Sequence, residues 1–171
     1  MKRNLDCLIV RQPYASLIAY GPKRWEFRTY YCRKRGVICI GSSKGRPLKT
    51  GSPQLNALSD SFPRGFALAT AILIDSFPAT GKELKATLNG EETVKIHGHI
   101  IKTASGPIGE PLKDIKNAIR DKTWNMFVWV LDNVTPLKNM VPLPDNVHGS
   151  TWTKVELAEN EPLSKSLLSY L

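Results

Sequence analysis

Cysteine and long apolar runs are both scarce in this 171-residue sequence. The three cysteines are an odd number without CxxC spacing, which is typical of free thiols in a reducing compartment. The longest apolar stretch, Phe66 to Ile74, is about half of the ~20 residues that a membrane-spanning helix needs. Asp6 interrupts an N-terminal apolar run that is too short for a signal peptide. We therefore expect a cytoplasmic protein with no membrane partner.

Acidic residues are scarce in the first third of the chain. Residues 1–60 hold 12 Lys and Arg but only three acids, whereas residues 61–171 hold 12 of each sign, so the net charge of +9 lies in the first third. Concentrated positive charge attracts polyanions, of which nucleic acid is the commonest inside cells. The charge distribution favours a nucleic-acid partner, with an acidic protein surface as the alternative.

The composition is otherwise that of a globular protein, with 42% hydrophobic and 23% charged residues. A chain of this length is expected to form one domain, spanning residues 1–171. Residues 80–124 are expected to contain an insertion, and residues 160–171 to form a C-terminal tail or helix.

Hydrophobic periodicity predicts more strands than helices, without regular alternation between the two. The expected fold class is mixed α/β but mainly β, a small β-barrel with short helices packed around it. Within the strand expected over 24–31, Trp25 and Phe27 should face the core, and Arg24, Glu26 and Arg28 the solvent. The expected strands are 5–10, 24–31, 36–43, 65–77, a weak strand over 94–101, and 125–137; the expected helices are 14–20, 52–58, 112–120 and a terminal helix from 162.

Familiar cofactor and metal motifs do not account for this sequence. The approach to a phosphate-binding GxxxxGK[ST] loop at Gly36–Gly41 has Ser42 where lysine is required. His97 and His99 would share one face of a strand, but no third ligand lies nearby in sequence. We expect neither a cofactor nor a metal.

Lys23, Glu26 and Arg28 form the constellation that most suggests a functional site. Three charged side chains within six residues, directly before and in a strand rich in aromatic residues, suit the floor of a polar cleft. Glu26 would stay ionised between Arg24 and Arg28, and the same cations would lower the pKa of Lys23. A surface ion-pair ladder of little energetic consequence is the equally weighted alternative.

The same segment resembles the ASCH family (activating-signal-cointegrator homology), which belongs to the PUA-like β-barrels. The resemblance lies in QPYASLI at 12–18, GxKxxExR at 21–28, RGxxxI at 35–40 and SSK at 42–44. A second match, FVWVLDNVTPL at 127–137 followed by GSTW at 149–152, is similar to the closing strand of the family. The resemblance implies a PUA-like barrel.

For function, the resemblance implies binding of RNA or a modified nucleobase. Some family members are amidohydrolases that deacetylate acetylated cytidine, and one branch is reported as a ribonuclease. Lys23 matches the lysine of the amidohydrolases, but Glu26 stands where they have threonine. If the protein is an enzyme, Lys23 and Glu26 are the candidate catalytic residues.

We therefore expect a nucleic-acid-binding module, with hydrolysis of acylated cytidine or RNA as the first alternative and a protein-interaction module as the second. Single-stranded RNA or a modified nucleoside is favoured over duplex DNA, because no recognition helix is apparent. The expected ligand-binding residues are Tyr14, Lys23, Glu26, Arg28, Ser42, Ser43, Lys44 and Trp152. The expected basic rim consists of Arg11, Arg33, Lys34, Arg35 and Arg46.

Overall fold

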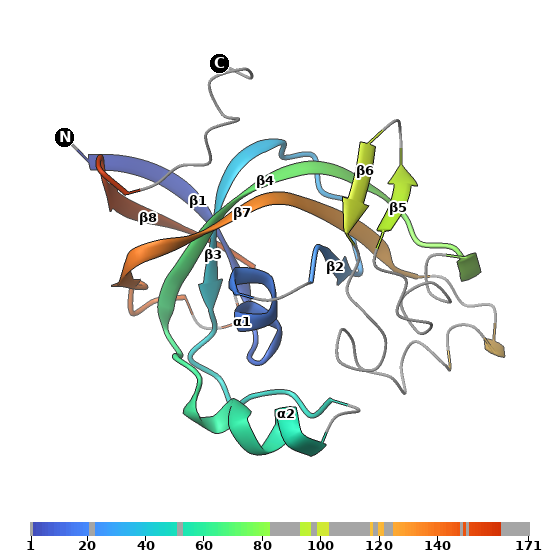
Figure 1. Ribbon diagram of the computed structural model, residues 1–171, viewed down its shortest axis with the longest axis horizontal. Helices are drawn as coiled ribbons and strands as arrows, with labels where there is room; N and C mark the ends of the chain where they lie inside the picture. Colours follow the sequence, from blue (N-terminus) through green and yellow to red (C-terminus); the bar gives the residue numbers. More distant parts are fainter. Residues whose placement is uncertain are drawn as a thin grey trace.

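In the residues that it describes, the computed structural model has eight strands and three short helical segments, and six of the strands form one curved sheet (Figure 1). The structure describes residues 2–20, 23–50, 53–82, 93–96, 99–102, 117, 120–121, 125–147, 149 and 151–161. The elements are β1 (Lys2–Val10), α1 (Tyr14–Ala19), β2 (Trp25–Arg28), β3 (Gly36–Ser42), α2 (Pro53–Leu58), the 3-10 helix η1 (Ser59–Ser61), β4 (Phe66–Pro78), β5 (Thr93–Ile96), β6 (His99–Lys102), β7 (Phe127–Pro142) and β8 (Trp152–Ala158).

Six of the strands form one mixed sheet in the order β2-β7-β4-β3-β1-β8. Only β1 and β3 run parallel; the other neighbouring pairs are antiparallel. Strands β5 and β6 form a separate antiparallel pair. The mainly β fold class predicted from the sequence is confirmed.

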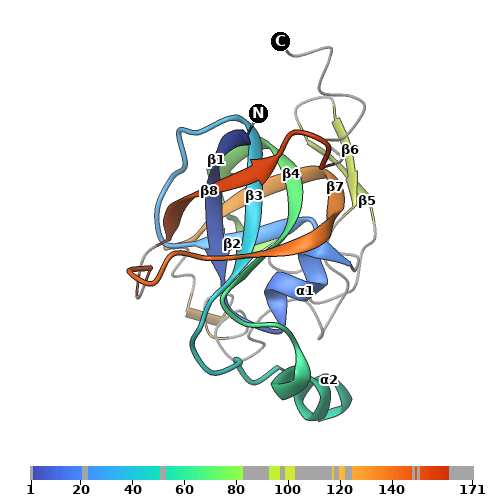
Figure 2. The same ribbon diagram turned by 90° about the vertical axis from the view of Figure 1, so that its left-hand side faces the viewer.

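The sheet curls until its two edges approach each other (Figure 2). Register shifts interrupt the pairing of the long strands β4 and β7 at three points, and such bulges bend a strand and increase its twist. Trp129 of β7 stacks on Trp152 of the edge strand β8, with ring centroids 5.7 Å apart. Arg28 of the opposite edge strand β2 donates a hydrogen bond to the backbone of Ile9 in β1. Side chains thus close the barrel along a seam between β2 and the β1–β8 edge.

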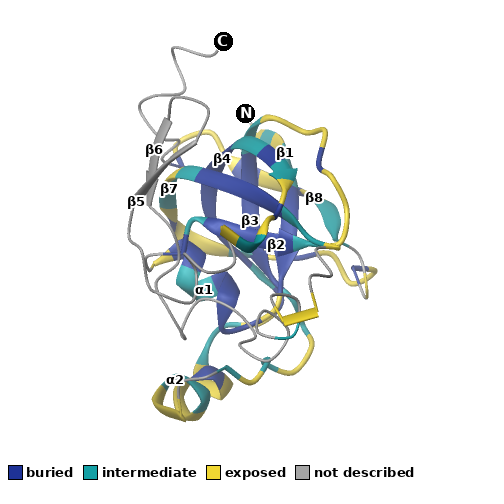
Figure 3. Ribbon diagram, turned by 90° about the vertical axis from the view of Figure 1, so that its right-hand side faces the viewer, coloured by how far each residue is buried: buried dark blue, intermediate teal, exposed yellow. Residues whose placement is uncertain are grey.

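The core lies inside this curled sheet, where the strands are buried, whereas α2 is largely exposed (Figure 3). Helix α1 buries Tyr14, Ala15, Ile18 and Ala19 against the inner face of the sheet. Trp25 and Trp129 are almost fully buried, as the strand pattern predicted. The residues around α1 include Leu8, Val10, Ile38, Ile40, Leu68, Leu73 and Leu131.

Two of the expected strands differ from the structure. The strand expected over 24–31 ends at Arg28, because residues 29–35 leave the sheet as a loop held by side-chain hydrogen bonds. The weak strand expected over 94–101 is two strands, β5 and β6, with Ile96 opposite His99. The single strand predicted to carry His97 and His99 is therefore wrong: β5 ends at Ile96 and β6 begins at His99, and His97 lies outside the described residues.

The remaining expected elements either agree more closely with the structure or lie outside the described residues. The strand expected over 125–137 begins at Phe127 and continues to Pro142 as β7. The helix expected over 112–120, the terminal helix from 162 and most of the insertion over 80–124 lie outside the described residues. Among the residues that the structure describes, no helix is long and apolar enough to cross a membrane.

Gly41 allows β3 to pack closely against the core beside β1. A Cβ at this position would lie 2.7 Å from Cys7 Sγ and 3.2 Å from Ile9 Cδ1. We predict that Gly41→Ala lowers the free energy of unfolding by about 1–3 kcal/mol, the usual range for overpacking. Urea unfolding measures this change. Gly45→Ala is the control, because its nearest neighbour is the side-chain oxygen of Ser43 at 3.3 Å; equal effects of the two variants would contradict the packing argument.

Candidate nucleotide site

Lys23 is fully buried between the end of α1 and the start of β2. Its backbone N–H donates to the Leu17 carbonyl of α1, 3.2 Å away. Its ammonium group donates to the Trp25 carbonyl and lies 3.6 Å from Glu26 Oε2. The same ammonium lies 5.4 Å from the ring centroid of Tyr14, a distance typical of cation–π contacts. Tyr14 thus lies beside Lys23 but is itself buried in the core.

Burial lowers the pKa of Lys23 to about 8. Loss of hydration is the largest cause; Arg28 lowers this pKa further, and Glu26 opposes the shift by attraction and by a hydrogen bond. The direction of the shift agrees with the sequence-based expectation. Its main cause differs, because the expectation invoked the neighbouring arginines, and Arg24 instead directs its guanidinium to the Ile18 and Lys23 carbonyls.

Glu26 and Arg28 form an ion pair at the outer side of Lys23. Arg28 Nη2 lies 2.8 Å from Glu26 Oε1, and their side chains are 21% and 9% exposed respectively. Glu26 is therefore buried, contrary to the solvent-facing position that strand alternation predicted. The pairing with Arg28 on one side and Lys23 on the other compensates the loss of water around the carboxylate.

Arg28 also connects the two sides of the seam. It donates to the Ile9 carbonyl over 2.9 Å, and its guanidinium lies 5.8 Å from the ring centroid of Trp129. The Arg28 Nε–H is buried and finds no hydrogen-bond acceptor within the described part of the chain. The guanidinium therefore retains donor capacity in a partly buried position.

A pair of tryptophans continues the cluster toward the surface. Trp129 is buried and stacks on the half-buried Trp152 at an interplanar angle of 17°. Lys34 lies over Trp152 at 5.3 Å and pairs with Asp6, which also binds Lys154. Lys23, Glu26, Arg28 and Trp152 thus lie along one continuous set of contacts, and the rim residue Lys34 adjoins it.

The other expected ligand-binding residues gather at the end of β3 and have partners there. The Ser42 hydroxyl donates to the Phe66 carbonyl and accepts from the Phe66 N–H. Ser43 Oγ accepts the Gly45 N–H, and Lys44 pairs with Asp145 at 2.7 Å. In the expected rim, Arg11 donates to the Arg46 carbonyl.

Sequence reasoning missed two members of the cluster. Trp129 is not among the expected ligand-binding residues, and Tyr30, which falls within the strand expected over 24–31, lies in the loop after β2. Tyr30 packs edge-to-face on Trp129 at 5.2 Å, and the Trp129 indole N–H donates to the Tyr30 carbonyl. The number of aromatic residues in RWEFRTYY was the available signal. Among the described residues, no group of three or more His, Cys, Asp or Glu side chains could hold a metal ion.

Comparison with known proteins finds similarity among solved structures. No family model matches the sequence, and no curated protein matches it. Among solved structures, two mutant forms of ZmASCH from Zymomonas mobilis are similar to this chain. The first has a TM-score of 0.49 and 11% identity, covering 88% of this chain and 87% of the other; the second has 0.47 and 12%, covering 88% of each.

The lowered pKa of Lys23 predicts a pH-dependent stability. The unfolded chain has the ordinary lysine pKa, so between pH 8 and 10.5 it holds a proton that the folded protein has released. Lys23 should therefore contribute a rise in the free energy of unfolding through this window, by about 2 kcal/mol between pH 8 and 9.5. The Cys7 thiol, whose pKa is raised by a hydrogen bond with Cys39 and by burial, acts in the opposite direction, so the contribution of Lys23 is the difference between the wild type and Lys23→Met. Urea unfolding at several pH values measures the rise.

The Lys23→Met variant should lack this rise, whereas Lys34→Met, which removes an exposed lysine, should retain it. An identical pH dependence in the wild type and in Lys23→Met would contradict the assignment.

Proposed function

We propose that this protein binds RNA or a single modified nucleobase through Lys23, Glu26 and Arg28. The observation that carries the proposal is the buried ion cluster itself, in which a carboxylate lies between two cations and beside a stacked tryptophan pair. Arg28 is its most exposed member and lies on the seam of the barrel.

Stability is a poor reason for this cluster to exist. In many proteins, the free-energy cost of removing two or three charges from water exceeds the gain from their mutual attraction. Apolar residues of similar size would stabilise the core as well. The lowered pKa of Lys23 adds to that cost at neutral pH. Buried charges with shifted pKa values collect at functional sites, and this supports a role in binding.

The groups present match the edges of a nucleobase. The Glu26 carboxylate can accept hydrogen bonds from an exocyclic amino group, and the Arg28 guanidinium can donate to a carbonyl or phosphate oxygen. Trp152 can stack on a base if the base replaces the Lys34 ammonium over its ring, because Trp129 already stacks on this indole. The basic rim residues Arg33 and Arg35 would attract the phosphate backbone without reading its sequence.

Single-stranded RNA or one nucleotide suits this site better than duplex DNA. In the described residues the α-helices are α1 and α2, of six residues each. Helix α1 is packed into the core, and the exposed α2 (PQLNAL) carries no basic residue, so neither suits the role of a recognition helix in a major groove. Bases splayed out of a single strand can instead reach the aromatic and polar groups of the seam.

Hydrolysis of an acylated cytidine is the second candidate, and the pKa of Lys23 favours it. A lysine with a pKa of about 8 is partly neutral near physiological pH and can act as a general base. The ammonium group is, however, fully buried and bonded to the Trp25 carbonyl. Substrate would have to reach it past Glu26 and Arg28, so we place binding first.

Arg28→Lys should weaken binding of cytidine monophosphate and of short RNA by about tenfold or more. Lysine keeps the charge but loses the planar set of donors that can serve Glu26, Ile9 and a ligand together. Calorimetric titration measures the affinity, and thermal unfolding checks that the variant is folded. Arg64→Lys, at an exposed arginine outside the site and the expected rim, is the control and should bind as the wild type does. An unchanged affinity in folded Arg28→Lys would exclude the proposed site.

The hydrolytic candidate predicts deacetylation of N4-acetylcytidine by the wild type and not by Lys23→Met. Its rate should increase as pH rises through about 8, because the neutral amine is the active form. Chromatography of the reaction mixture detects cytidine. Turnover that survives in Lys23→Met would remove Lys23 from catalysis, and absence of turnover in the wild type would leave binding alone.

A further inference from the structure

Two adjacent tyrosines in the loop after β2 are unusually exposed for aromatic side chains. Tyr30 is 42% and Tyr31 46% exposed, and both belong to the segment 29–35 that joins β2 to β3. The sequence continues with Arg33, Lys34 and Arg35, so aromatic and basic side chains are interleaved here. This combination is typical of surfaces that bind single-stranded nucleic acid.

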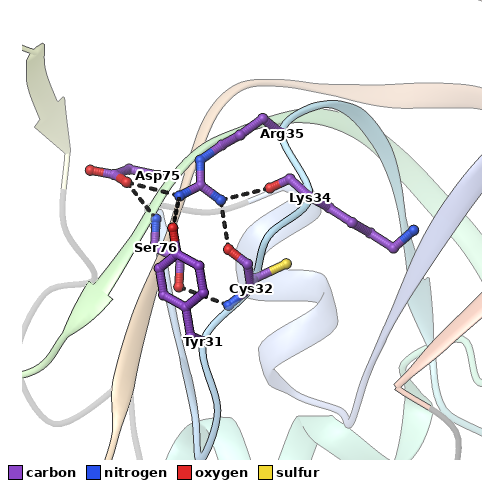
Figure 4. A network of polar contacts seen from close by, with 6 residues as sticks. All are labelled: Tyr31, Cys32, Lys34, Arg35, Asp75 and Ser76. Atoms are coloured by element: carbon purple, nitrogen blue, oxygen red, sulfur yellow. Dashed lines mark hydrogen bonds and ion pairs between the residues drawn. The ribbon is translucent and has the colours of Figure 1, made fainter.

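The loop that carries these tyrosines is held in place by a network of polar contacts (Figure 4). Arg35 donates to the carbonyls of Cys32 and Lys34, to the Tyr31 hydroxyl and to Asp75. The Cys32 N–H donates to Ser76 Oγ across to β4. The loop is thus fastened to the sheet at several points, and a ligand need not order it first.

The tyrosine surface is continuous with the Lys23–Glu26–Arg28 cluster. Tyr30 packs on Trp129, and the Arg28 guanidinium lies over the same indole. Tyr31 packs edge-to-face on Phe127 at 6.1 Å, and Arg35 lies over the Tyr31 ring at 5.7 Å. A nucleotide chain leaving the cluster at Arg28 would therefore meet Tyr30 and then Tyr31.

Cations exceed carboxylates on this surface. Asp6 pairs with Lys34 and Lys154, and Asp75 pairs with Arg35. These ion pairs neutralise part of the positive charge. Arg33 adds an exposed cation beside them. The remaining positive charge complements a phosphodiester backbone.

We propose that Tyr30 and Tyr31 form a stacking platform for the bases of single-stranded RNA next to the nucleotide held by the Lys23–Glu26–Arg28 cluster. The inference rests on the proposed function and makes its ligand an RNA of several nucleotides instead of a free nucleoside. Arg33, Lys34 and Arg35 contact the phosphates of this chain.

The test compares affinities for cytidine monophosphate and for cytidine oligonucleotides of two, four and six residues. Fluorescence anisotropy of labelled six-residue RNA, with the shorter ligands as competitors, supplies the values. Wild-type affinity should increase with length up to about four residues. Replacing both Tyr30 and Tyr31 by alanine should reduce affinity for the six-residue RNA by tenfold to a hundredfold, because stacking on two rings is lost. The affinity for the mononucleotide should stay within about twofold.

Two matched variants separate stacking from a general loss of structure. Replacing both tyrosines by phenylalanine keeps the rings and should keep the affinity for RNA, although it removes the hydroxyl that Arg35 contacts. Tyr20→Ala removes another exposed tyrosine, 56% exposed at the end of α1, and should have no effect.

The double alanine variant could bind the six-residue RNA as tightly as the wild type while Arg28→Lys still weakens binding. That result would overturn the stacking platform and leave the proposed function standing. Failure of the wild type to bind any of these ligands would overturn both.

Discussion

The ion pair between Glu26 and Arg28 is the contact on which both the site and the closure of the barrel depend. The 2.8 Å contact positions the guanidinium, which reaches across the seam to the Ile9 carbonyl and lies over Trp129. Loss of the Glu26 charge would leave Lys23 and Arg28 as neighbouring, largely buried cations, an arrangement that destabilises proteins strongly. The residues that would recognise a ligand are therefore also residues that hold the fold.

Because side chains close the barrel, the seam carries polar and aromatic groups that could bind a ligand. Within the sheet, the backbone N–H and C=O groups of neighbouring strands form hydrogen bonds with each other. Strands β1 and β8 pair in this way as far as Leu8 and Trp152. Beyond that pair the Ile9 N–H still bonds to Thr151, but the Ile9 carbonyl receives Arg28. Polar and aromatic side chains thus occupy the place of a further strand. A nucleotide can compete for such groups, whereas it could not displace a continuous backbone ladder.

Local patterns in the sequence predicted those parts of the molecule that depend on neighbouring residues. Alternation of apolar and polar residues predicted most of the strands, although not β8, and the spacing of Lys23, Glu26 and Arg28 indicated a common site. The burial of Glu26 could not be predicted, because it depends on an ion pair that alternation does not represent. The stacking of Trp129 on Trp152 and the bond from Arg28 to Ile9 join distant segments, and only the curvature of the sheet brings them together. The end of β2 at Arg28 follows from contacts of Cys32 and Arg35 with β4, which lie far along the chain.

The central claim is that a nucleotide meets the Arg28 side of the buried cluster. Nuclear magnetic resonance of 15N-labelled protein tests it most directly, because arginine Nε–H and tryptophan indole N–H groups give separate signals. During titration with a six-residue single-stranded RNA, the largest shifts should occur at Arg28 Nε–H and at the indoles of Trp129 and Trp152, while the indole of Trp25 on the other side of β2 stays in place. Shifts confined to residues at the end of β3, such as Arg46, with Arg28 and both indoles unchanged, would contradict the account.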